Sequence, residues 1–247
     1  MSVNPYNPPK AEATGADLSI DGLSGGEYQF KVPDPKWLFR AFIAFAVLET
    51  VALIVEFLNA TMLLADNTWI DFGENTYAPF WIIYAAASFG MLPVFIAIIV
   101  LYGAWVRPAN RNARAFGMQG LQFTPGWCLG WFFFPIGNLF QPYRAVRELN
   151  QSASEFAQPE DPKSWNKLPT PIVGWWWFFW LAANGFTNLE ARVFWDEPAT
   201  ELVARLSSAT GVFTSTLWLV AAFLCCQVIR TINKRQLAKK KSLAVVA

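Results

Sequence analysis

The chain has 247 residues and a net charge of +1; 54% of its residues are hydrophobic and only 15% are charged. Such a chain is too apolar for an ordinary soluble domain and too long for a single membrane anchor. Histidine is absent, which removes the commonest general base and metal ligand, so we expect no enzymatic activity, no cofactor and no metal site.

The first 35 residues are rich in proline and glycine and show almost no apolar periodicity. This pattern predicts a disordered cytoplasmic tail, residues 1–35, followed by a membrane helical domain over 36–232 and a basic cytoplasmic tail over 233–247. The opening NPYNPP can adopt an extended polyproline conformation, which a protein partner can recognise.

The first predicted span begins near Trp37 and continues to about Asn59. Glu49 and Glu56 lie inside it, seven residues apart, and therefore share one helical face. A charge at mid-membrane costs about 2.5–3.5 kcal/mol on insertion scales, so both side chains should face protein or water. They form either a proton or cation relay, or a protonated or hydrogen-bonded pair that fixes helix packing.

The second predicted span runs from about Ala78 to Trp105 and contains no charged residue. A stretch with Arg107, Arg111 and Arg114 and no acid follows it. Basic residues just beyond a span indicate a cytoplasmic loop. Such loops are common beside membranes, so we expect no nucleic-acid partner.

The stretch from Phe123 to Asn150 starts like a membrane helix, but prolines interrupt it before it reaches the roughly 20 residues that a span needs. Proline removes a backbone donor and disfavours helix at the residue before it. We expect a non-helical break centred on Pro135 and Asn138, in a segment that enters the bilayer and turns back. Asn138 would bind freed backbone groups or cap the following helix. A fifth, kinked span is the alternative.

A helix is predicted after the break, with Pro142 in its first turn. Arg144 and Glu148 are four residues apart and should pair on its exposed side. The next span opens near Pro171 and ends near residue 187, and the amide of Asn184 should bond to another helix.

The last predicted span covers about residues 211–229, and a run of lysines and arginines follows it. The stretches 60–78 and 188–209 are acidic instead. If the broken segment is re-entrant, every basic flank falls on one side and both termini are cytoplasmic. The predicted fold is therefore an all-α polytopic membrane bundle of four transmembrane helices plus a proline-broken re-entrant helix. Its basic flanks favour anionic lipid.

The central run RNARAFGMQGLQFTPGWCLGWFFFPIGNLFQPYRAVREL resembles the signature of bacterial membrane proteins grouped as domain of unknown function 4328. The family pattern maps onto Asn112, Pro125, Gly126, Trp127, Pro135, Asn138, Pro142, Glu148 and Leu149. A downstream tryptophan cluster with Asn184 and a final span that ends in basic residues also fit, and the likeness covers about residues 40–235. The resemblance implies a bacterial inner-membrane protein and brings no activity with it.

Two functions remain open. The first is a non-enzymatic membrane scaffold or regulatory interaction protein, with basic flanks that bind lipid and a proline-rich tail that binds a partner. The alternative is a small transporter or channel that uses the broken helix together with Glu49, Glu56 and Asn138, because interrupted helices present unpaired backbone groups to ions or substrates.

Overall fold

The computed structural model describes residues 30–66, 78–193 and 201–246. The predicted disordered tail lies almost entirely outside these residues, as do parts of both acidic stretches. All regular structure in the described ranges is helical, which confirms the all-α class, and all of it belongs to the unit Lys31–Ala247. The elements are α1 (Lys36–Asp66), α2 (Ala78–Ala115), α3 (Trp127–Gly130), η1 (Trp131–Phe133), η2 (Gly137–Leu139), α4 (Gln141–Ser152), η3 (Pro162–Ser164), α5 (Pro171–Val193) and α6 (Glu201–Val246).

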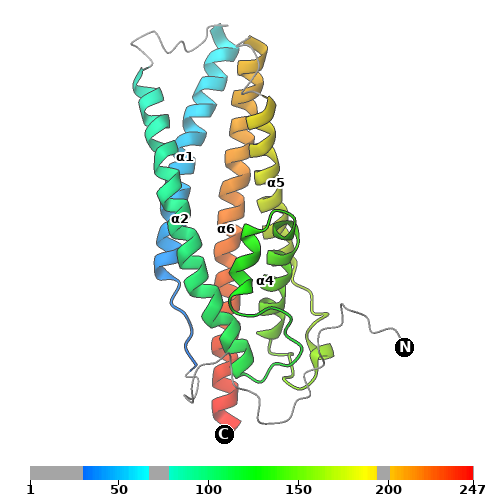
Figure 1. Cartoon of the computed structure of the whole chain (residues 1–247). Helices are drawn as coiled ribbons and strands as arrows, with labels where there is room; N and C mark the ends of the chain where they lie inside the picture. The colour runs from blue at the N-terminus through cyan, green and yellow to red at the C-terminus, as the bar shows by residue number, and fades with distance from the viewer. Residues whose placement is uncertain (1–29, 67–77, 194–200, 247) are drawn as a thin grey trace, which may run out of the picture. The chain divides into compact units, whose positions relative to one another are not determined.

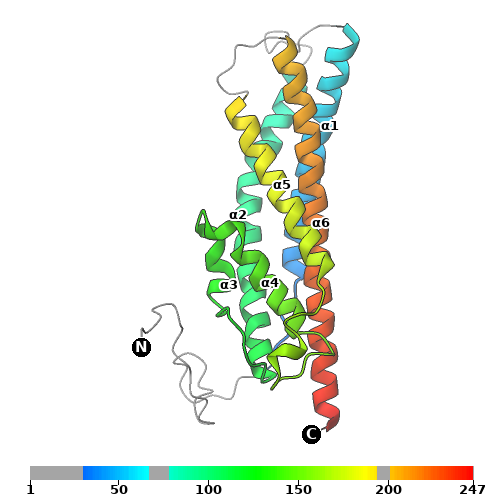
Figure 2. The same ribbon diagram turned by 90° about the vertical axis from the view of Figure 1, so that its right-hand side faces the viewer.

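The long helices α1, α2, α5 and α6 run alongside one another, as Figures 1 and 2 show. Helix α6 packs between α1 and α5, and α1 packs on α2. A hairpin made of α3, η1, η2 and α4 packs against α2 and α5 beside one half of the bundle (Figure 2). The start of α1 and the ends of α2 and α6 all lie toward the end of the bundle drawn lowest in Figure 1, here called the base.

Among the described residues, three helices are long and apolar enough to cross a membrane, within Lys36–Thr61, Ile82–Ala115 and Leu206–Ser242. Helix α5, the fourth predicted span, is not one of these three. Large apolar side chains are exposed along the outer faces of the first two helices: Ile43, Val47, Ile54, Phe57, Phe89, Leu92, Ile96 and Val100. Apolar surface of this extent marks contact with lipid or a partner, and on helices of this length it indicates a membrane protein.

The predicted break is present in the middle of the chain. The helix begun at Trp127 tightens into η1, Phe134 is extended with φ −102° and ψ 115°, and η2 then leads to α4. The chain is therefore not one continuous kinked helix here. The predicted capping role of Asn138 is wrong, because Phe140 is the N-cap of α4 and no side chain caps that helix. Pro142 does occupy the first turn of α4, where a missing N–H has no cost.

Two stretches predicted as loop or tail are helical. Helix α2 continues through residues 107–114 to Ala115, and α6 continues through the predicted tail to Val246. Charge alone favoured loops at both places. The helices persist because their polar side chains are buried and bonded: Asn110, Asn112 and Gln236 have no exposed surface.

Helices α2 and α6 are joined at the base by buried side-chain amides. The indole Nε1 of Trp105 donates to Asn233 Oδ1 at 2.9 Å. The Nδ2 of Asn112 donates to Gln236 Oε1 at 3.0 Å, and the Nε2 of Gln236 donates to the carbonyl oxygen of Ala109 at 2.8 Å. These bonds set the register of α6 against α2.

The same amides hold the chain that leads into α1. The Nδ2 of Asn112 donates to the Lys31 carbonyl oxygen at 3.0 Å, and the Nδ2 of Asn233 donates to the Pro33 carbonyl oxygen at 3.2 Å. The Oδ1 of Asp34 then accepts the backbone N–H of Lys36 at 3.0 Å, at the start of α1. The last residues before the first helix are thus bound to the bundle.

Glu148 of α4 is buried rather than paired with Arg144 as predicted. Its Oε2 accepts the backbone N–H of Gln122 at 2.7 Å, and its Oε1 accepts that of Phe123 at 3.2 Å. Arg144 instead donates to Gln122 Oε1 at 3.2 Å. Burial raises the pKa of the Glu148 carboxyl above its ordinary value, although these two N–H groups and the nearby arginines oppose that shift. The carboxylate orders the loop before the hairpin.

Replacing Gln236 by alanine should lower the free energy of unfolding by about 1–3 kcal/mol, because the carbonyl of Ala109 and the amide of Asn112 would stay buried without this partner. Thermal unfolding of the purified protein in detergent measures the change. Lys234, exposed on the same helix, provides the control substitution Lys234→Ala. Equal stability losses in the two variants would contradict the role given to the amide network.

Candidate functional site

A cavity of about 590 Å³ lies among α1, α2, α5 and α6. Its lining combines carboxyl and hydroxyl groups with a few apolar side chains: Glu49, Ala52, Glu56, Tyr84, Ser88, Met91, Thr187, Glu190, Ala191, Ser207, Gly211, Thr214, Ser215 and Trp218. The two glutamates of the first predicted span thus face one cavity, and a third carboxylate joins them from α5.

Each carboxyl group of this acidic cavity lies beside a hydroxyl group that can donate a hydrogen bond. Ser215 lies beside Glu49, and Tyr84 lies beside Glu56. Thr214 Oγ1 donates to Glu190 Oε1 at 3.1 Å. These donors come from α2 and α6, so the carboxyl groups bridge helices.

The lining contains no lysine or arginine in the described part of the chain. Glu49 is 8% exposed, while Glu56 and Glu190 are partly buried. Neutral hydroxyl donors satisfy some of the oxygen lone pairs but do not balance a negative charge. Charge removed from water without an opposite charge is costly, so the arrangement favours uptake of a proton or a cation.

The geometry also indicates how such a cation would be held. Within the described residues, no three acidic or cysteine side chains are close enough together to hold a metal ion. Tight coordination of a divalent metal needs several oxygen ligands around one point. The carboxyl and hydroxyl groups of the lining supply oxygen atoms of the kind that bind cations.

Gly211 of α6 makes room for Glu56. A Cβ atom at this position would lie 3.1 Å from Glu56 Cδ and 3.3 Å from its Oε2, closer than ordinary van der Waals contact. The missing side chain lets the Glu56 carboxyl group lie against the backbone of α6. A larger residue here would require the Glu56 carboxyl group to move by a few tenths of an ångström.

Glu190 was missed because α5 was expected to end near residue 187, with Glu190 in an outer acidic loop. The helix continues to Val193 and turns Glu190 inward. The hydroxyl-rich run around Thr214 and Ser215, within an otherwise apolar predicted span, was the available signal for the opposite wall.

The other predicted residues lie elsewhere. Asn138 does not line the acidic cavity, so the predicted grouping of Asn138 with Glu49 and Glu56 does not form. With Pro135 it lies in the turn of the hairpin, which contacts α5 through a bond from Trp177 Nε1 to the Leu139 carbonyl oxygen at 3.1 Å. The amide of Asn184 donates to the Trp180 carbonyl oxygen at 2.8 Å in its own helix, and not to another helix as predicted.

A family model described as Domain of unknown function (DUF4328) matches residues 78–234. The matched region begins at α2 and ends within α6, after Asn233 but before Gln236 of the amide network. It includes the hairpin and Glu190 but not the two glutamates of α1. Comparisons with curated proteins and with solved structures gave no match.

Replacing Gly211 by alanine should destabilise the bundle by about 1–3 kcal/mol, because the new methyl group displaces Glu56. The matched control is Gly185→Ala in α5, where a Cβ meets nothing within 4 Å. Thermal unfolding measures both. Adding Glu56→Ala to the Gly211 variant should restore most of the loss, and absence of that rescue would argue against the close approach.

Proposed function

The chain belongs to the family described as Domain of unknown function (DUF4328), and on that premise we propose that it is a multi-pass protein of the bacterial inner membrane that binds and passes protons or monovalent cations through the acidic cavity. The observation that carries the proposal is the set of three carboxyl groups with hydroxyl partners and no basic residue in the described lining. Acidic groups inside a membrane bundle commonly mark ion pathways or proton relays.

We propose that α5 also crosses the membrane, which gives four membrane spans. Its 23 residues correspond to about 34 Å of helix, slightly more than the about 30 Å hydrocarbon layer. Trp175, Phe178 and Leu189 are exposed along it and can face lipid. Its tryptophans favour the membrane interface.

The hairpin is proposed to enter the membrane from the cytoplasmic side and return. Its turn exposes Phe133, Phe134, Ile136 and Phe140 to the surroundings, with Ile136 80% exposed. Apolar groups of this size at a turn are stabilised by lipid. Its non-helical backbone is partly satisfied by internal bonds, such as that from the Asn138 N–H to the Phe134 carbonyl oxygen at 2.6 Å.

Both termini are proposed to be cytoplasmic, because the start of α1 and the end of α6 lie at the base (Figure 1) together with the basic residues. Exposed cations there include Arg107, Arg144, Arg230, Lys234 and Lys241. Each basic residue near an anionic leaflet contributes about 1 kcal/mol to membrane binding. The base is therefore also the proposed contact with anionic lipid.

The second candidate function is a non-enzymatic scaffold or regulatory interaction protein. The rigid base favours it, since buried amides hold a basic surface in one geometry. In both candidate functions the protein binds ions, lipid or a partner protein and does not catalyse a reaction. A measurement of ion flux distinguishes the two candidate functions.

Purified protein in liposomes that contain a pH-sensitive dye should dissipate an imposed proton gradient, alone or in exchange for potassium or sodium. Glu49→Gln and Glu190→Gln should each lower the rate by about tenfold or more, because each removes a charge from the cavity. The matched control is Glu155→Gln, because the side chain of Glu155 is exposed and lies outside the acidic cavity. Rates no greater than those of empty liposomes, in potassium, sodium and choline buffers alike, would favour the scaffold instead.

Topology is tested separately with single cysteines at Ser2 and Ala247 in a variant without the native cysteines. An impermeant maleimide should label neither position in intact cells and both after lysis, because both termini are proposed to be cytoplasmic. A cysteine at Asp71, in the acidic stretch after α1, should be labelled in intact cells. Labelling of either terminus without lysis would defeat the four-span topology.

A further inference from the structure

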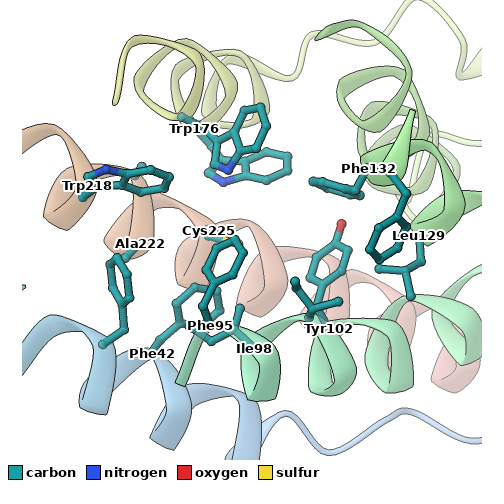
Figure 3. Close-up of a pocket in the computed structure, with 15 residues that line it drawn as sticks. Phe42, Phe95, Ile98, Tyr102, Leu129, Phe132, Trp176, Trp218, Ala222 and Cys225 are labelled. Atoms are coloured by element: carbon teal, nitrogen blue, oxygen red, sulfur yellow. The ribbon is translucent and has the colours of Figure 1, made fainter. Parts of the chain in front are cut away.

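A second cavity, of about 270 Å³, lies among α1, α2, α5, α6 and the hairpin (Figure 3). Its walls are mostly aromatic, with rings from every one of these parts: Phe42, Phe95, Phe132, Trp176, Trp180 and Trp218. Cavities that bind small molecules have this character, with apolar walls and few polar groups that fix the orientation of the ligand.

One polar group of this aromatic cavity has no partner. The hydroxyl of Tyr102 is buried, the residue is 7% exposed, and no hydrogen-bond partner lies within reach among the described residues. Figure 3 shows its oxygen directed away from α2 toward the side of the cavity formed by Phe132 and Trp176. The ring is held in place by contacts with Trp105 and Phe132, each at 5.6 Å between centroids. Buried hydroxyl groups are usually bonded, so an ordered but unpaired one points to a ligand.

The cavity is open toward the apolar surface of the bundle. Phe95 and Phe133 line it and are 44% and 64% exposed. Both belong to surfaces that face lipid in the proposed topology. A ligand would therefore enter from the bilayer and must dissolve in it.

We propose that the aromatic cavity binds the ring of a membrane quinone, with the Tyr102 hydroxyl donating a hydrogen bond to a ring carbonyl oxygen. Flat faces of Phe132, Trp176 and Trp180 suit a flat conjugated ring. The volume admits a ring system but not a whole lipid, so the apolar tail extends between Phe95 and Phe133 into the bilayer.

A fatty acid fits less well. Its carboxylate would need a cation or several donors, whereas no basic side chain is present in the described lining, and Tyr102 supplies one neutral donor. A quinone carbonyl needs only that one donor. The proposal concerns a different cavity from the acidic one and does not depend on ion flux.

The test uses the purified full chain in detergent and 2-methyl-1,4-naphthoquinone as the probe. Binding is followed by quenching of tryptophan fluorescence and by calorimetry, since Trp176, Trp180 and Trp218 line the cavity. The parent should show saturable binding. Tyr102→Phe should weaken it by about tenfold, because only the hydroxyl is removed. Tyr143→Phe, on α4 outside the cavity, should bind like the parent.

Filling the cavity provides an independent test. Ala222→Phe should abolish binding, with Cys225→Leu as a second such variant, and thermal unfolding identifies variants that remain folded. Glu49→Gln should leave naphthoquinone binding unchanged. Three results would overturn the proposal: no saturable binding to the parent, equal affinities for the parent and Tyr102→Phe, or displacement of the quinone by equimolar palmitate.

Discussion

A polar group buried inside a helix bundle must find its partner within the protein, because packing excludes water and lipid offers no partner. This constraint explains the base, where amides, an indole and backbone carbonyls of α2, α6 and the lead-in to α1 bond to one another. It extends to α4, since Arg235 of α6 donates to Asn150 Oδ1 at 2.6 Å and Lys239 donates to the Ser152 carbonyl oxygen at 3.1 Å. The long α6 is thereby fixed against three other parts of the chain.

The same constraint is met only in part at several places among the described residues, and both cavities are among them. In the acidic cavity, neutral hydroxyl groups lie beside the carboxyl groups but leave their charge unbalanced. In the aromatic cavity, the Tyr102 hydroxyl is left unpaired. Trp218 lines both cavities, and its Nε1 donates to Thr187 Oγ1 at 3.2 Å. Incomplete satisfaction of polar groups that line a cavity is the physical basis for placing ligands there.

Local chemistry made several features predictable from the sequence. Prolines and Gly137 indicated the break before α4, because their backbone effects need no tertiary context. Helical periodicity placed Glu49 and Glu56 on one face, and the run around Pro135 and Asn138 indicated the family, which the match over residues 78–234 confirms.

Features that depend on distant contacts were missed or misplaced. Asn112 is hydrogen-bonded to Gln236, which lies 124 positions later in the chain, and the sequence around either residue does not predict that contact. The basic residues of 107–114 led us to predict a loop, although buried amides keep this stretch helical. Glu148 and Arg144 have the spacing of a surface ion pair. The Glu148 carboxylate instead accepts hydrogen bonds from backbone N–H groups of the preceding loop. Tertiary contacts outweigh local propensity at each of these places.

We propose that the carboxyl groups of the acidic cavity exchange protons or cations. Infrared difference spectroscopy of the purified protein, recorded on adding acid, potassium or sodium, observes those groups directly. Such exchange should change the carboxyl and carboxylate bands on the addition, and these changes should be smaller in Glu49→Gln and in Glu56→Gln. Difference spectra identical in the parent and both variants would contradict it.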